Sequence, residues 1–302
     1  MSFHTDALRI VGEVAVKTIF QLQMIAGAQA NVILFFCSIS PVLLGHKQRP
    51  THMILTHMAV SNLLVLLSPR IPYTMAAFVL RNPLSSLGCK SVYYIHRVAR
   101  STTLCSTCVP STYQFFTLNP RRVEWTMLRG RAPKLIGPSC CTCWIFSVLL
   151  NVYIPVTVTG PLDMKNDTDT QGEWFCSSSS HHTNLVILWS ISDVMFVSLL
   201  IWSGGSMMLL LHRHQLKMQC IHTPTGYHRC PPEMRAAHTI LMIVVTFVIS
   251  YVLNSIFTLY ILVHLNYKLW LQQICHVLAS CFPTFSPFLL LLRDPRFPRF
   301  CS

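Results

Sequence analysis

Acidic residues and glycine are scarce in this chain. Among its 302 residues, Asp and Glu total 10, Gly totals 11, and charged residues make up 11%, whereas a soluble domain usually has about 25%. All but one of the acidic residues fall in short polar stretches, so no apolar segment holds a carboxylate pair for acid–base catalysis or a proton relay. The glycines form no phosphate-binding loop. We therefore expect neither an enzyme nor a resident cofactor.

Hydrophobic residues, by contrast, make up 52% of the chain, and the mean hydropathy is +0.48. They occur in long blocks. A membrane-spanning helix needs about 20 apolar residues, whereas a membrane-spanning strand needs about 10. Seven blocks are near or above the helical length, at about Ile19–Leu44, Met53–Val79, Tyr93–Phe116, Leu135–Val158, Leu185–Leu211, Thr239–Val263 and Leu269–Leu292. The sequence therefore predicts an all-α membrane protein, with a seven-transmembrane-helix bundle over residues 19–292.

Basic residues give the predicted orientation. The net charge is +13, but the basic residues lie in short gaps between apolar blocks and form no patch for nucleic acid. Inner loops of membrane proteins carry an excess of Lys and Arg. With the N-terminus outside, fourteen of the 23 Lys and Arg residues fall in inner segments, six in outer segments and three inside helices. We therefore predict an extracellular N-terminus (1–18) without a cleaved signal peptide, a second outer loop (about 159–184), a third inner loop (about 212–238) and a cytoplasmic tail (293–302).

Two features of the outer segments agree with this orientation. Asn166 begins the sequon Asn-Asp-Thr between the fourth and fifth blocks, and glycans are added only on the lumenal side. Cys89 precedes the third block and Cys176 lies in the same outer loop as the sequon. Disulfides persist on the oxidising face, so we predict a Cys89–Cys176 disulfide. An unoccupied sequon and two free thiols are the alternatives.

Five further cysteines are predicted to pack in the core. Cys105 and Cys108 have CxxC spacing, but they lie in the middle of an apolar block without a second ligand pair. A zinc or redox site would need more ligands or an exposed thiolate. Cys140, Cys141 and Cys143 begin the fourth block and are expected to pack there. We therefore predict no metal site.

Three charged side chains fall inside the apolar blocks at comparable depths. Arg97 and Arg100 lie in the third block and Asp193 in the fifth, all roughly 7–13 Å from the outer ends of their helices. Intramembrane charges usually face a cavity or each other. Asp193 is therefore expected to approach an arginine, either as a structural ion pair or as a pair that polarises a ligand. Arg70 in the second block is expected to snorkel outward or to line the same cavity.

Several prolines also fall inside the apolar blocks. They are Pro69, Pro72, Pro110, Pro155, Pro283 and Pro287. Each lacks the backbone donor of a helical residue and can kink its helix. Kinks open spaces between helices, although neighbouring helices can also accommodate them.

A set of short motifs is distributed along nearly the whole chain. They are Gly88-Cys89-Lys90 and His96-Arg97-Val98-Ala99-Arg100 before and in the third block, Cys105-Ser106-Thr107-Cys108, Gln114 and Asn119-Pro120-Arg121, Phe175-Cys176 after the sequon, Asp193-Val194-Met195-Phe196, Trp202-Ser203-Gly204 and Leu211-His212-Arg213-His214, Pro232-Glu233-Met234-Arg235-Ala236, and Cys281-Phe282-Pro283-Thr284-Phe285-Ser286-Pro287-Phe288. Together they resemble the motifs of the vomeronasal type-1 (pheromone) receptors, which are G protein-coupled receptors.

The chain departs from the family pattern at several positions. Ile25 and Ala30 stand where the family has glycines, Pro69-Arg70 replaces a lysine-glycine pair, and Pro110 replaces a leucine. A degenerate copy of the receptor that does not signal is therefore an alternative. Asn62 stands where the wider rhodopsin-like class often has an aspartate, so we expect no sodium site.

The resemblance implies a mechanism at the plasma membrane of vomeronasal sensory neurons. A small volatile or steroid-like ligand enters the outer half of the bundle and shifts the population of helix packings. The residues expected to contact it are Tyr93, Arg97, Arg100, Asp193, Phe257 and Tyr260. The inner ends then engage a heterotrimeric G protein of the inhibitory class. The basic residues expected to face that protein are Arg121, Arg122, Arg213 and Arg235.

Two other functions compatible with this architecture are considered. A bitter-taste-like chemoreceptor shares the seven-helix plan, but the motifs of the fifth to seventh blocks favour the vomeronasal family. A small transporter usually shows internal repeats and coupling-ion carboxylates at the midplane. The sequence has no such repeat, and Asp193 is its one intramembrane acid.

Overall fold

The computed structural model describes residues 2–45, 50–68, 86–118, 123–159, 177–178, 183–220, 232–264 and 269–291. This part of the chain holds seven long helices, in agreement with the predicted all-α bundle. They are α1 (Ser2–Leu43), α2 (Pro50–Leu67), α4 (Ser86–Leu118), α5 (Val123–Leu150), α7 (Thr183–Cys220), α8 (Pro232–His264) and α9 (Leu269–Leu291). A short helix, α6 (Ile154–Thr157), and a two-residue antiparallel pair, β1 (Val158–Thr159) and β2 (Ser177–Ser178), complete it.

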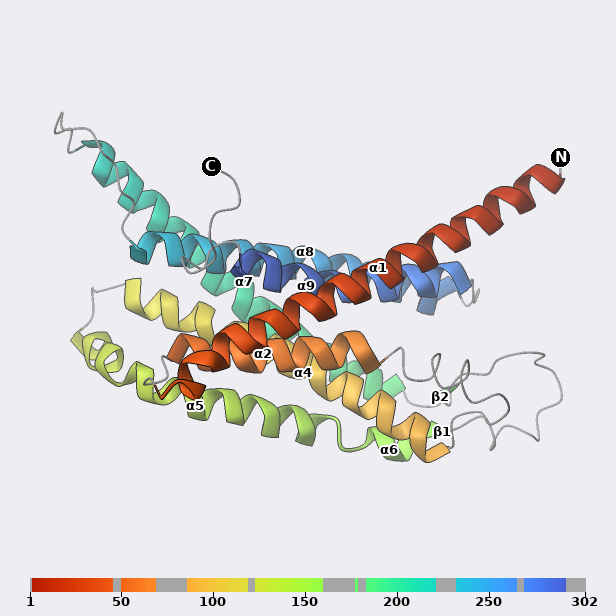
Figure 1. Cartoon of the computed structure of the whole chain (residues 1–302), viewed down its shortest axis with the longest axis horizontal. Helices are drawn as coiled ribbons and strands as arrows, with labels where there is room; N and C mark the ends of the chain where they lie inside the picture. Colours follow the sequence, from red (N-terminus) through yellow and green to blue (C-terminus); the bar gives the residue numbers. More distant parts are fainter. Residues whose placement is uncertain are drawn as a thin grey trace.

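The long helices lie side by side in one bundle, and the N-terminal end of α1 projects beyond it (Figure 1). Among the described residues, five stretches are long and apolar enough to cross a membrane: Val14–Leu43, Gly137–Val156, Asp193–Leu210, Ile240–Phe257 and Ile274–Leu291. Helix α2 adds a shorter apolar run, His52–Leu67. Helix α4 carries Lys90, Arg97 and Arg100 along its length, which lowers its hydropathy.

The bundle is apolar outside and partly polar inside. Large apolar side chains such as Val194 and Leu209 are 64% and 65% exposed. Asn31, Asn62 and Asn151 are almost fully buried. A bilayer supplies no water to polar groups, so they turn toward the protein interior, whereas apolar side chains can face lipid at no cost. The pattern is that of a helical bundle surrounded by hydrocarbon.

Several helices extend beyond the predicted apolar blocks. Helix α1 begins at Ser2, so most of the expected N-terminal segment 1–18 is helical. Helix α7 continues to Cys220 and α8 begins at Pro232, which shortens the non-helical part of the expected inner loop 212–238. The physical reason is that the length of an apolar block reflects the thickness of the bilayer, and not the full length of the helix. A helix satisfies its own backbone hydrogen bonds and can continue into water.

The fourth predicted helix is shorter at its outer end than expected. Helix α5 ends at Leu150, and α6 follows after a turn. Pro155 has no backbone N–H, so it cannot bond to the carbonyl of Asn151. That carbonyl accepts instead from Ile154 N at 3.0 Å. The expectation that Pro155 disturbs its helix is thus confirmed.

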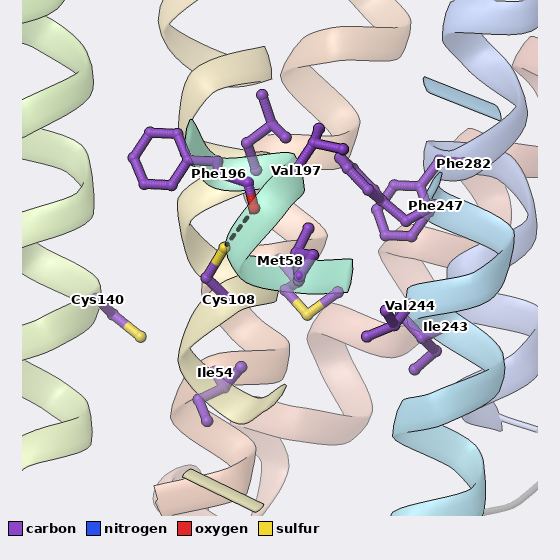
Figure 2. Close-up of a cluster of buried hydrophobic side chains, with 12 residues drawn as sticks. Ile54, Met58, Cys108, Cys140, Phe196, Val197, Ile243, Val244, Phe247 and Phe282 are labelled. Atoms are coloured by element: carbon purple, nitrogen blue, oxygen red, sulfur yellow. Dashed lines mark hydrogen bonds between the residues drawn. The ribbon is translucent and has the colours of Figure 1, made fainter. Parts of the chain in front are cut away.

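The hydrophobic core is formed by side chains of α2, α4, α5, α7, α8 and α9. Phe247 and Phe282 form an edge-to-face pair with ring centroids 4.5 Å apart (Figure 2). Cys108 Sγ donates to the carbonyl of Phe196 at 3.7 Å (Figure 2). Cys108 and Cys140 are both buried in this core, as predicted for soft, small side chains.

A buried polar network joins α1, α2 and α9. Asn31 Nδ2 donates to the carbonyls of Gly27 and Pro283, both at 2.8 Å. Asn62 Nδ2 donates to Asn31 Oδ1 at 3.2 Å and to Ser286 Oγ at 3.1 Å. Two side-chain amides therefore connect three helices in a region where unsatisfied polar groups are costly.

Candidate functional site

A partly enclosed cavity lies between α2, α4, α8 and α9, within the part of the chain that the structure describes. Its volume is about 40 Å³. Its lining is mostly apolar, with a few polar groups contributed by α4 and α8. The lining residues are Val65, Arg100, Thr103, Leu104, Phe247, Ser250, Tyr251, Asn254, Leu278, Ala279, Phe282 and Pro283. An apolar pocket with a few convergent polar groups is the usual form of a small-molecule site.

Arg100 on α4 is the charged residue of this lining. Its guanidinium carbon lies 5.3 Å from the centre of the Tyr251 ring. In the amide orientation that satisfies both neighbours, Asn254 Oδ1 accepts from Arg100 Nη2 at 2.9 Å and Asn254 Nδ2 donates to the carbonyl of Cys275 at 3.0 Å. A cation over an aromatic face in a desolvated site is stabilised by about 2 kcal/mol or more. The guanidinium of α4 is thus held by two residues of α8.

Tyr251 also interacts with the intramembrane acid. Its side chain interacts electrostatically with both Asp193 on α7 and Arg100 on α4. Charged groups of two helices therefore act on one tyrosine of α8.

Arg97 lies in a second polar group around Tyr153, at the outer end of α5. Tyr153 interacts electrostatically with Arg97, Tyr93 and Asp193. Asp193 therefore interacts electrostatically with both Tyr153 and Tyr251.

His96 is a further polar residue of α4 near this site. Its Nδ1 lies 2.9 Å from Ser68 Oγ, and both side chains are largely removed from solvent. His96 and His276 also interact electrostatically with Arg100. Arg100 therefore interacts with residues of α4, α8 and α9.

Comparison with known proteins identifies the kind of bundle that holds this site. A family model described as the vomeronasal organ pheromone receptor family matches residues 14–302. The human vomeronasal type-1 receptor 2 is 37% identical over 284 residues, which span 93% of this chain and 72% of that receptor. The chain belongs to the vomeronasal type-1 receptor family.

Other relatives of this vomeronasal-family chain include the human vomeronasal type-1 receptor 4, which is 37% identical over 271 residues, or 88% of each chain. Olfactory receptor class A-like protein 1 of Danio rerio is 28% identical over 277 residues, which span 90% of this chain and 87% of that protein. Vomeronasal type-1 receptors are seven-helix G protein-coupled receptors rather than enzymes. The chain is thus a multi-pass receptor of the cell membrane, of the pheromone-receptor type.

Not all predicted ligand residues of this vomeronasal-family receptor lie at the cavity. Arg100 lines it, whereas Tyr93, Arg97, Asp193, Phe257 and Tyr260 are not among its lining residues. Tyr260 is 52% exposed on α8, and Tyr93 is 37% exposed on α4. Asp193 interacts electrostatically with Tyr251, which lines the cavity, whereas Arg97 interacts electrostatically with Tyr153, which does not.

Sequence reasoning missed the two residues that hold Arg100. Tyr251 and Asn254 stand three positions apart in a uniformly apolar helix, and so share one face of α8,. The sequence feature that could have identified them is their spacing of three positions, which places both side chains on one face of the helix after the third inner loop.

Several predicted positions lie outside the described part of the chain. These are Asn166, Cys176, Arg121 and Arg122, and the side chains of Cys89 and Arg235. Arg213 is described and exposed on the extension of α7.

Two expectations about the cysteines require correction. Cys141, expected to pack in the core, is exposed. Cys105 and Cys143, expected to be small core residues, are joined in a disulfide between α4 and α5, with Cα atoms 5.6 Å apart. The two helices are also linked by Asn151 Nδ2, which donates to Ser101 Oγ at 3.2 Å. The pairing depends on how α4 and α5 are aligned, which the spacing within each helix does not reveal.

Proposed function

We propose that this receptor senses small pheromone-type ligands in vomeronasal sensory neurons and signals through a heterotrimeric G protein of the inhibitory class. The observation that carries the ligand part is the cavity between α2, α4, α8 and α9, with the Arg100 cation in its lining. An apolar wall with one strong donor suits a compact, largely apolar molecule that carries a hydrogen-bond acceptor. Ligand contacts of Tyr93, Arg97, Asp193, Phe257 and Tyr260 are part of this proposal.

The inner ends of the helices are proposed to face the G protein and the anionic inner leaflet. Arg213 lies exposed on the extension of α7, and Arg121, Arg122 and Arg235 belong to neighbouring inner segments of the sequence. Basic residues near the membrane surface attract anionic lipid at about 1 kcal/mol each. In this proposal the same residues contact the G protein when the helix ends rearrange.

The function is tested in cells that express the full chain with an inhibitory-class G protein reporter. A panel of small volatile and steroid-like compounds supplies the ligands. For any active compound, Arg100→Ala is expected to weaken the response about tenfold or more, because a buried hydrogen bond to a charged group is lost. Lys90→Ala removes a cation from the same helix away from the cavity lining and is expected to keep the wild-type response.

Two results would contradict this function. If Arg100→Ala and Lys90→Ala respond alike at equal surface expression, the cavity is not where the ligand binds. Ligand-dependent uptake or current from the purified chain in liposomes would favour a transporter instead.

The outer face is proposed to carry a glycan on Asn166 and a disulfide between Cys89 and Cys176. The expected result for Asn166→Gln is the loss of a glycosidase-sensitive mobility shift that the wild-type chain shows, because Asn166 would be lumenal in the N-out orientation. Surface labelling of intact cells checks delivery in parallel. A wild-type chain that reaches the surface without any shift would argue against the glycan, and a Cys89→Ser variant delivered normally would argue against the disulfide.

A further inference from the structure

The disulfide between Cys105 on α4 and Cys143 on α5 lies inside the membrane-spanning part of the bundle. The apolar span of α5 begins at Gly137, so Cys143 is roughly 9 Å from the inner end of that span, at about 1.5 Å per residue. The hydrocarbon layer is about 30 Å thick. Thiol–disulfide exchange needs a thiolate, and a charge is costly at this depth. Exchange with a water-soluble disulfide is therefore disfavoured at this pair.

Two more cysteines offer the same spacing but are not joined. Cys108 follows Cys105 by three positions, and Cys140 precedes Cys143 by three. Both are buried free thiols. Cys108 Sγ donates to the carbonyl of Phe196 on α7 at 3.7 Å and so turns toward that helix (Figure 2). The packing of α4 and α5 therefore selects one of two evenly spaced pairs.

The two residues of the joined pair differ in access. Cys143 is 3% exposed, whereas Cys105 is partly exposed. The exposed surface of α5 in this region is apolar, with Ile145 61% and Leu149 63% exposed, so the surrounding medium at this level is hydrocarbon. A reagent dissolved in that medium has to be neutral, and it reaches Cys105 before Cys143.

We propose that Cys105 and Cys143 form an oxidation site for lipid hydroperoxides, which are neutral oxidants formed on unsaturated acyl chains. In the first step, the Cys105 sulfur attacks the terminal oxygen of the hydroperoxide, the O–O bond breaks, and the thiol proton passes to the leaving alkoxide. The products are a sulfenic acid on Cys105 and a lipid alcohol. In the second step, the Cys143 sulfur attacks the sulfenic sulfur, the S–S bond forms, and the thiol proton leaves with the hydroxyl group as water. Two thiols are oxidised and one hydroperoxide is reduced.

The consequence of this oxidation is a link between two helices of the bundle. The disulfide joins positions that are 38 residues apart in the sequence, and such a link lowers the conformational entropy of the unfolded chain. Oxidation of the reduced receptor is therefore expected to raise its melting temperature by roughly 5–15 °C.

The experiment uses the full chain, purified into lipid nanodiscs. It needs neither ligand nor G protein, so its outcome is independent of the proposed function. Receptor reduced with a neutral phosphine is exposed to cumene hydroperoxide, which enters the bilayer, or to oxidised glutathione, which stays in water. Free thiols are then alkylated, and the peptides are mapped by mass spectrometry. The Cys105–Cys143 link is expected to form at least about tenfold faster with the hydroperoxide, while Cys108 and Cys140 stay open to alkylation.

Dimedone, which reacts with sulfenic acids, identifies the sulfur that is oxidised first. In Cys143→Ser, dimedone is expected to label Cys105 after hydroperoxide treatment, whereas in Cys105→Ser the buried Cys143 is expected to stay unlabelled. Cys140→Ser is the matched control, because it removes a buried thiol one turn away and is expected to form the link like wild type. Should Cys143→Ser not fold, dimedone added to wild type together with the hydroperoxide gives the same reading.

The melting temperature gives an independent check. A rise after hydroperoxide treatment in wild type and Cys140→Ser, absent from Cys143→Ser, would support the inference. Equal rates of linkage with the two oxidants would overturn it, as would dimedone labelling of Cys143 in place of Cys105. Loss of the Cys108 and Cys140 thiols as fast as those of the joined pair would show that the packing does not select the pair, and would overturn it too.

Discussion

Asn31→Ala is expected to lower the melting temperature of the purified receptor by roughly 5–15 °C and to deplete it from the cell surface. Asn31 is fully buried and donates to the carbonyls of Gly27 and Pro283, while its own oxygen accepts from Asn62. Losing these bonds and leaving buried partners unsatisfied costs about 2–4 kcal/mol, and each kcal/mol corresponds to about 2–4 °C in a chain of this size range.

The size of this effect follows from a proline four positions along α9. The carbonyl of Pro283 would normally accept from the N–H of residue 287, but Pro287 has none,. Asn31 supplies the missing donor from α1. Without Asn31, that carbonyl is left in an apolar interior, where water cannot easily replace the bond.

The control is Gln29→Ala, which truncates an amide two residues earlier on the same helix. Gln29 is exposed on the lipid-facing side of α1, so its removal is expected to leave stability within about 0.5 kcal/mol of wild type. Thermal unfolding of both variants in the same detergent makes the comparison. Equal melting temperatures for Asn31→Ala and wild type would mean that the network between α1, α2 and α9 contributes no net stability.

The number of helices was predictable because the bilayer fixes the length of an apolar block. Their ends were not, because a helix continues past the membrane wherever its residues permit, as Ser2 to Glu13 of α1 and the end of α7 show. A disturbance of the helix near Pro155 could be predicted, since proline lacks a backbone donor. The position of the turn after Leu150 could not, because it depends on local backbone geometry.

Only the charged residues of the candidate site could be predicted from the sequence. Arg100 and Asp193 stand out because a charge inside a membrane helix is costly unless it is partnered. Tyr251 and Asn254 do not, because α8 is apolar nearly all round and no periodicity marks its inner face,. The Cys105–Cys143 disulfide could not be predicted for a related reason, since the spacing of residues in the sequence does not show which faces of α4 and α5 meet.

The departures from the family pattern can be placed in the fold. Ile25 is 57% exposed and points away from the bundle, so its bulk meets lipid rather than a neighbouring helix. Ala30 is 2% exposed, and its small side chain fits in the interior of the bundle. Pro110 lies within α4, which continues to Leu118, whereas Pro69 and Arg70 lie outside the described residues. Ile25, Ala30 and Pro110 are thus all accommodated in the described helices.

The glycine that α1 retains in this region is expected to matter far more than those it has lost. A Cβ at Gly27 would lie 2.8 Å from Thr284 Oγ1, 3.0 Å from Leu66 Cδ1 and 3.1 Å from the backbone Cα of Thr284. Helix α1 therefore approaches α2 and α9 so closely that only hydrogen fits. Thr284 Oγ1 also donates to the carbonyl of Gln23 at 3.3 Å, so moving Thr284 would loosen a second link between α1 and α9.

Gly27→Ala is accordingly expected to destabilise the receptor by about 1–3 kcal/mol, the usual cost of overpacking, even though alanine favours a helix by roughly 0.5–1 kcal/mol over glycine. Gly205→Ala on α7 isolates the gain in helix propensity, because a Cβ there meets nothing within 4 Å. This variant is expected to be neutral or slightly stabilising. Melting temperatures and surface levels of the two alanine variants, measured side by side, give the test. If Gly27→Ala proves as stable as Gly205→Ala, the close approach of α1 to α9 is not needed for assembly.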